Sequence, residues 1–105
     1  MNLKIKNDKE RTIVLLSGNI DIPAAEILKK NLFKICEDGK KEIILDFKEV
    51  QSIGSSGIGA LIFFHKRFTE MAGKIRIINV NKNIRSLFGI IKLDGLFEIS
   101  EAGLP

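Results

Sequence analysis

Ser55 and Ser56, flanked by Gly54 and Gly57, are the residues whose type and spacing most clearly suggest chemistry. A serine hydroxyl becomes a nucleophile when a neighbouring base removes its proton. The nucleophile elbow of serine hydrolases has the pattern G-x-S-x-G, and this segment is one residue short of it. His65 is the only histidine in the chain, so no second histidine is available as a base. We therefore expect a binding module rather than an enzyme.

The glycines of this segment do not form a nucleotide-binding loop. Gly54, Gly57 and Gly59 give the pattern G-x-x-G-x-G, which matches neither the dinucleotide-binding fingerprint nor the P-loop. At the start of a helix, Gly57 and Gly59 would each cost about 1 kcal/mol relative to alanine. Either they fit tight packing, with Ser55 as the helix cap, or they let another molecule approach the backbone closely. The sequence leaves both explanations open.

The composition argues against metal, nucleic-acid and membrane roles. One histidine and one cysteine, Cys36, are too few for a zinc site of the usual ligands, so we expect no metal or cofactor. The net charge of +4 comes mainly from scattered lysines, and the chain has no tyrosine or tryptophan for stacking on bases. A lone cysteine favours a reducing compartment, and the longest apolar stretch, 58–64, is far shorter than the ~20 residues that span a bilayer. We therefore expect a cytoplasmic protein without nucleic-acid contact or membrane insertion.

Apolar periodicity predicts alternating strands and helices in one domain, residues 1–105. We expect strands at 3–6, 12–17, 42–47, 74–80 and 97–99, and helices from Pro23 to Asp38, from Ser55 to Gly73 and across 84–91. The order β-β-α-β-α-β-α-β predicts an α/β fold with a mixed, mostly parallel sheet and helices packed on it. The opening hairpin supplies the antiparallel pair.

Each helix should bury one apolar stripe against the sheet. The first helix should use Ala25, Leu28, Leu32 and Ile35, and the second Ile58, Leu61, Ile62, His65 and Phe68. Phe63 and Phe64 are adjacent and must point in different directions. Either one of them is partly exposed and could anchor a partner, or both are buried. The segment 50–59 should lie between the central strand and the second helix, as a turn at the carboxyl edge of the sheet, where ligands of such folds bind.

Three motifs, in order along the chain, resemble the STAS domain, the fold of bacterial anti-sigma factor antagonists. The apolar strand 43–47 is followed by Gly54-Ser55-Ser56-Gly57-Ile58-Gly59, Gly18-Asn19-Ile20-Asp21 precedes Ala24-Ala25, and a Leu-Phe tail pattern lies in 93–99. The resemblance covers nearly the whole chain. The sequence departs from the family pattern at Gly54, where the family usually has an aspartate. The missing carboxylate removes a charge that a partner kinase would recognise.

The resemblance implies phosphorylation of Ser55, with Ser56 as the second choice. It implies a partner that is both an anti-sigma factor and a serine kinase of the histidine-kinase-like ATPase type. The unphosphorylated protein would bind this partner and release a sigma factor, which regulates transcription in stress or sporulation. Phosphorylation would end the binding, and a serine phosphatase would restore it. The expected partner-binding residues are Asp21, Ile22, Pro23, Gly54, Ser55, Ser56, Gly57, Ile58 and Gly59.

A different role remains open at this point. Some STAS domains serve as subunits of larger assemblies, so the chain could be a non-phosphorylated subunit of a lipid-transport or other signalling complex. The two roles differ in one chemical respect, which is whether the Ser55 hydroxyl accepts a phosphate.

Overall fold

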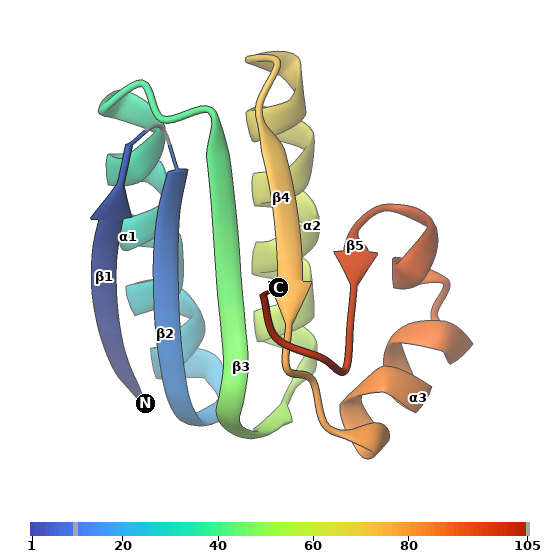
Figure 1. Ribbon diagram of the computed structural model, residues 1–105. Helices are drawn as coiled ribbons and strands as arrows, with labels where there is room; N and C mark the ends of the chain where they lie inside the picture. The colour runs from blue at the N-terminus through green and yellow to red at the C-terminus, as the bar shows by residue number, and fades with distance from the viewer. Residues whose placement is uncertain (10, 105) are drawn as a thin grey trace.

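A five-stranded sheet with three α-helices makes up the computed structural model, which describes residues 1–9 and 11–104 (Figure 1). The strands are β1 (Asn2–Asp8), β2 (Arg11–Ile20), β3 (Glu42–Ile53), β4 (Lys74–Ile78) and β5 (Glu98–Ile99). The helices are α1 (Ile22–Glu37), α2 (Ser55–Glu70) and α3 (Lys82–Ile90), with a short 3-10 helix η1 (Leu93–Gly95). The strand order is β1-β2-β3-β4-β5, and only the β1–β2 pair is antiparallel among the described residues. The predicted mixed, mostly parallel α/β fold is confirmed.

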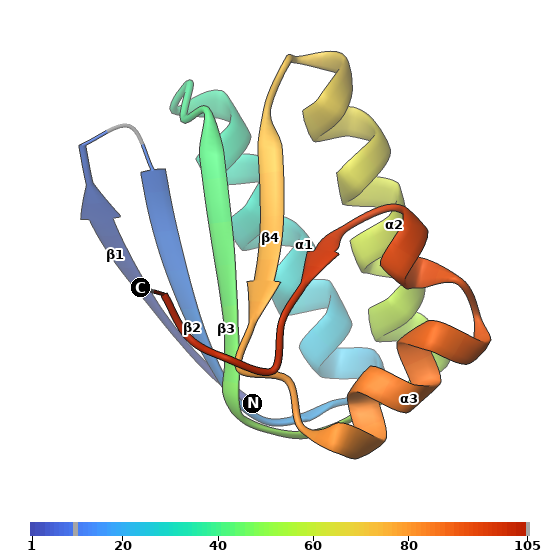
Figure 2. The same cartoon turned by 45° about the vertical axis from the view of Figure 1, so that its right-hand side comes forward.

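Helices α1 and α2 cover the same face of the sheet, while α3 and η1 lie beyond β4, next to β5 (Figures 1 and 2). Each of α1 and α2 connects two parallel neighbours, and right-handed crossovers in the same direction place both helices on one side. The core fills the space between them and the sheet, where Leu28, Leu32, Phe47, Leu61 and Phe68 are buried. The whole stripe predicted for α1 is buried.

The buried side of α2 differs from the prediction. Its buried residues are Gly57, Ala60, Leu61, Phe64 and Phe68. Ile62 is 42% exposed, and His65 is half-buried beside Phe97, with 4.8 Å between the ring centroids. Because α2 carries apolar residues on two adjacent sides, periodicity alone did not decide which side would face the sheet.

Strands β2 and β3 both extend further than predicted. β2 continues through Gly18, and β3 continues through the segment 50–53 that was expected to be a turn. The parallel register shifts between Leu15 and Ser17 and again between Gly18 and Asn19. Gly18 adopts a φ of +91°, which a side chain would disfavour, and such bulges let pairing resume after an extra residue. As a result both strands end together at the pair Ile20–Ile53.

The C-terminal end of α2 also differs from the prediction. The helix ends at Glu70, and Ala72 rather than Gly73 takes the left-handed conformation, with a φ of +61°. A Cβ atom at position 73 would lie 2.4 Å from Cε2 of Phe68. Gly73 is therefore needed because the Phe68 ring packs directly against the backbone.

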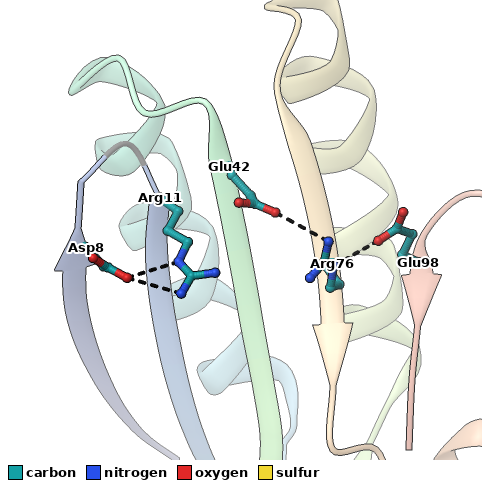
Figure 3. A network of polar contacts seen from close by, with 5 residues as sticks. All are labelled: Asp8, Arg11, Glu42, Arg76 and Glu98. Atoms are coloured by element: carbon teal, nitrogen blue, oxygen red, sulfur yellow. Dashed lines mark hydrogen bonds and ion pairs between the residues drawn. The ribbon is translucent and has the colours of Figure 1, made fainter. Parts of the chain in front are cut away.

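The face of the sheet opposite the helices carries ion pairs between strands (Figure 3). Arg11 binds Asp8 at 3.1 Å, and Arg76 contacts Glu98 at 2.8 Å and Glu42 at 3.7 Å. These side chains are partly exposed, so water screens the pairs and each contributes little to stability. The candidate functional site lies elsewhere, where β2 and β3 lead into α1 and α2.

Candidate partner-binding and phosphorylation site

The first residues of α1 and α2 lie side by side at the carboxyl edge of the sheet, at the bottom of Figure 1. Asp21 and Gly54, which follow the paired residues Ile20 and Ile53, are the N-caps of the two helices. The backbone N–H of Gly54 donates to the carbonyl oxygen of Ile20 at 3.0 Å. The equal ends of β2 and β3 therefore bring two segments, 21–23 and 54–59, to one corner of the molecule.

Asp21 caps the N-terminus of α1. Its Oδ1 accepts a hydrogen bond from the backbone N–H of Ala24 at 3.0 Å, and its carbonyl oxygen accepts from the N–H of Ala25 at 2.8 Å. Ile22 and Pro23 form the exposed first turn, and the Ile22 side chain is 70% exposed. The corner thus presents a carboxylate and a large aliphatic side chain to solvent.

Ser55 is the first residue of α2 and is exposed, while Ser56 is half-buried. The expectation that Ser55 caps this helix is wrong, because the cap is Gly54 and no side chain of the described residues bonds to the first-turn N–H groups. The first turn also holds no acidic residue. Free N–H groups and the positive end of the helix dipole favour an anion at this position, so a phosphate on Ser55 would be stabilised locally.

Different structural features account for the glycines at positions 57 and 59. Gly57 is buried, and a Cβ atom there would lie 2.7 Å from Cγ2 of Ile20 and 2.7 Å from Cγ1 of Ile53. Tight packing therefore explains Gly57, which lets α2 lie close against the strand ends, while its expected contact with a partner stays a prediction. Gly59 is exposed, and a Cβ atom there would meet nothing within 4 Å. Packing does not explain Gly59, whose bare backbone is open to another molecule.

We expect Gly59→Ala to raise the free energy of unfolding by about 0.5–1 kcal/mol, because alanine is the better helix former and the new methyl group meets no obstacle. Urea unfolding followed by circular dichroism measures this gain. The matched control is Ser86→Ala, an exposed small-residue change in α3, which should stabilise less. A loss of stability on Gly59→Ala would mean that the backbone at this position is not an unstrained helix.

Side chains from β2, β3 and the start of α3 add a polar network that the sequence motifs did not indicate. The Ser52 hydroxyl donates to Oδ1 of Asn19 at 2.8 Å. Asn81 caps α3 by accepting from the N–H of Ile84 at 2.8 Å, and its Nδ2 donates to the carbonyl oxygen of Val50 at 3.3 Å. A third helix N-terminus is thereby tied to the end of β3. The Asn immediately before an amphipathic segment was the available signal for this cap.

The adjacent phenylalanines of α2 point in different directions. Phe63 is 53% exposed and Phe64 is 2% exposed, so of the two alternatives left open by the sequence, the structure shows the one in which one ring is partly exposed. The Phe63 ring lies 5.8 Å from the Phe33 ring of α1 in an edge-to-face arrangement. Its use as an anchor for a partner stays a prediction.

No group of three potential metal-ligating side chains occurs within residues 1–9 and 11–104. Burial raises the pKa of the Cys36 thiol, although the nearby Arg67 acts in the opposite direction. The thiol is thus held in its less reactive, protonated form. None of the helices in the described part of the chain is long and apolar enough to cross a membrane.

Known proteins resemble this chain along nearly its full length. The STAS domain family model matches residues 2–102. The anti-sigma-B factor antagonist of Bacillus subtilis is 25% identical over 100 residues, which cover 95% of this chain and 91% of the relative. The anti-sigma F factor antagonist of Paenibacillus polymyxa is 28% identical over 102 residues, which cover 94% and 85% of the two chains.

Solved structures agree with this family match at the level of the fold. The anti-sigma factor antagonist SpoIIAA in its unphosphorylated form has a TM-score of 0.79 and 19% identity, over 97% of this chain and 90% of that one. The phosphorylated form of Bacillus SpoIIAA has a TM-score of 0.75 and 20% identity, over 93% and 90%. Likeness at these identities establishes a shared architecture.

Proposed function

Because the chain belongs to the STAS domain family, we propose that it is an anti-sigma factor antagonist whose binding is switched by phosphorylation of Ser55. The names of the two relatives favour this role over that of a non-phosphorylated subunit of a transport complex. The protein acts by binding and has no catalytic activity of its own in this proposal. Its partners are an anti-sigma factor that is also a serine kinase, and a serine phosphatase.

One observation carries the proposal, namely the position of the Ser55 hydroxyl. It is exposed at the first residue of α2, where the N–H groups of the helix have no side-chain cap. A kinase can reach this hydroxyl without unfolding any element. The helix end can then accept the phosphate, which adds about −1.5 to −2 charges, without a cost to the core.

The switch in this proposal acts on the docking surface and not on the fold. The surface consists of the exposed or half-buried residues at the corner: Asp21, Ile22, Pro23, Gly54, Ser55, Ser56, Ile58 and Gly59. The Asp21 carboxylate lies at the start of the neighbouring helix, so a phosphate on Ser55 would add to negative charge already at this corner. An acidic group of the anti-sigma factor would then be repelled.

Compared with the aspartate that the family usually has, Gly54 removes a negative charge from this surface and leaves the backbone shape unchanged. The residue has a φ of −91°, and a Cβ atom there would lie 3.7 Å from the carbonyl oxygen of Ile20, an ordinary contact distance. The fold therefore admits an aspartate, the residue that the family usually has at this position. We propose that glycine at this position alters how the kinase recognises the site and leaves Ser55 available as its acceptor.

Incubation with the anti-sigma factor kinase of the same genome and ATP, followed by intact-mass analysis, tests the proposal. We expect the wild-type protein to gain one phosphate, Ser55→Ala to gain none, and Ser56→Ala to gain one. Ser55→Ala should still bind the anti-sigma factor, because the unphosphorylated state is the binding state.

Two results would contradict this proposal. Phosphate on Ser55→Ala combined with none on Ser56→Ala would move the acceptor to Ser56. Failure of the wild-type protein to bind any anti-sigma factor, together with no phosphate uptake, would favour a role as a non-phosphorylated subunit of another complex.

A further inference from the structure

The outer surface between α1 and α2 carries a cluster of aromatic and basic side chains, here called the α1–α2 seam, formed by Lys29, Phe33, Phe63 and Arg67. The two phenylalanine rings meet edge to face at 5.8 Å. Nζ of Lys29 lies 5.8 Å from the Phe63 ring centre, and Cζ of Arg67 lies 5.7 Å from the Phe33 ring centre. The aromatic pair therefore has a cation on each ring, which fixes its position.

Phe63 remains half-exposed despite these contacts. Its side chain is 53% exposed, whereas the next residue, Phe64, is buried in the core. An exposed aromatic ring held rigidly among other side chains loses little conformational freedom when a partner covers it. Aromatic side chains, phenylalanine among them, are enriched in the cores of protein interfaces, where a few anchors carry most of the binding energy.

The middle turns of the two helices carry more basic than acidic side chains. Residues 26–34 and 63–67 contain five basic side chains and one acidic side chain, namely Lys29, Lys30, Lys34, Lys66, Arg67 and Glu26. Glu37 and Glu70, near the C-terminal ends of the same helices, bring the net charge of α1 (+1) and α2 (+1) together to +2, so a positive excess remains. An acidic partner segment is therefore the complementary occupant.

The seam continues from the proposed phosphorylation site. Ser55, Gly59 and Phe63 follow one another at intervals of four residues, all exposed, so they rise about 12 Å along α2 at 1.5 Å per residue. Gly59, between them, presents bare backbone with nothing within 4 Å of a Cβ position. A chain lying along α2 can therefore contact Ser55 and Phe63 together.

We propose that the α1–α2 seam binds an acidic, amphipathic segment of the anti-sigma factor, an inference that rests on the proposed function. An apolar side chain of the segment covers Phe63, and its carboxylates face Lys29 and Arg67. The segment runs past Gly59 towards Ser55. A phosphate on Ser55 then repels the same acidic segment that the seam attracts, which gives the switch its electrostatic basis.

Affinity measurements with the purified anti-sigma factor kinase, in the absence of ATP, test this inference. We expect Phe63→Ala to raise Kd at least tenfold, and Lys29→Glu and Arg67→Glu to raise Kd while reducing its salt dependence. The matched controls lie far from the seam. Ile90→Ala removes a 79% exposed side chain from α3, and Lys4→Glu reverses an exposed charge on β1; both should bind as the wild type does. Circular dichroism confirms that each variant is folded.

The outcomes separate the seam from the proposed function. If the wild-type protein binds the kinase and the seam variants bind equally well, the seam is not the docking surface, while the proposed function stands. If the wild-type protein neither binds the kinase nor gains a phosphate from it, both fail. Self-association in analytical ultracentrifugation that Phe63→Ala abolishes would identify a second copy of the chain as the occupant. Phe63-dependent binding to phosphatidylserine vesicles would identify a membrane, and either result would overturn the inference.

Discussion

Ser55→Asp is expected to weaken binding to the anti-sigma factor about 10- to 100-fold and to leave the domain folded. A negative charge at the first residue of a helix interacts favourably with the helix dipole, by about 0.3–1 kcal/mol, so the melting temperature should stay the same or rise slightly. The loss of affinity comes from placing that charge opposite an acidic partner group, because like charges at an interface cost several kcal/mol. Isothermal titration calorimetry and a thermal melt measure the two effects.

Ser55→Asn is the matched control, since asparagine has nearly the same size as aspartate and no charge. It should bind much more tightly than Ser55→Asp, and the difference should shrink at high salt, because ions screen exposed charges. Equal weakening by both variants would show that bulk at position 55 operates the switch. Unfolding of Ser55→Asp would contradict the account in which the helix end accepts an anion.

The second large effect is expected at Gly57, where alanine should lower the free energy of unfolding by about 2 kcal/mol. The added methyl group would lie 2.7 Å from Cγ2 of Ile20 and from Cγ1 of Ile53, and overpacking of this kind costs about 1–3 kcal/mol. For a domain of this size, such a loss lowers the melting temperature by roughly 10 °C. Urea unfolding gives the free energy directly.

Gly59→Ala is the internal control for Gly57→Ala, because the same substitution two residues later on the same helix is expected to stabilise. A double-mutant cycle with Ile53→Ala identifies the source of the strain. Ile53→Ala removes the crowding atoms of Ile53, while Cγ2 of Ile20 stays in place, so the combined loss should be smaller than the sum of the two single losses. Additive losses would mean that contact with Ile53 is not what excludes a side chain at position 57.

Much of the architecture was predictable from local patterns. Three patterns each predict a single type of secondary structure. The β-branched run in β2 and the near-continuous apolar run at the start of β3 predict strands. The apolar stripe of α1 predicts a helix, and it consists of Ala25, Leu28, Leu32 and Ile35. The alternation of strands and helices then determines a mostly parallel sheet. Each of these signals depends on residues close together in the sequence.

The errors arose where distant residues decide the local structure. Val50 to Ile53 alternate poorly and include Ser52, yet they form a strand because β2, bent at Gly18, pairs with them. The buried side of α2 was ambiguous because the sheet decides which of its two apolar sides is covered, and the sheet is formed by residues distant in the sequence. Ser55 has the chemistry of a helix cap, but Gly54 takes that position because β3 ends one residue before it.

The sequence motifs predicted which residues form the candidate site, but not how the fold brings them together. Gly54 to Gly59 and Asp21 were identified from their motifs. Their closeness depends on the paired strand ends at Ile20 and Ile53, which no local pattern reveals. The α1–α2 seam likewise joins Phe33 and Phe63, which are thirty positions apart in the sequence.

The hydrogen bond from the Gly54 N–H to the Ile20 carbonyl oxygen, at 3.0 Å, bears on how several proteins can gain access to Ser55. It holds Ser55, the proposed phosphate acceptor, at a corner where two helices begin, so every protein that must reach Ser55 needs the same small area. In the proposed cycle the kinase and the phosphatase would therefore exclude each other. The two enzymes would compete for one binding site around Ser55. The fraction of the protein that is phosphorylated would therefore depend on their relative amounts.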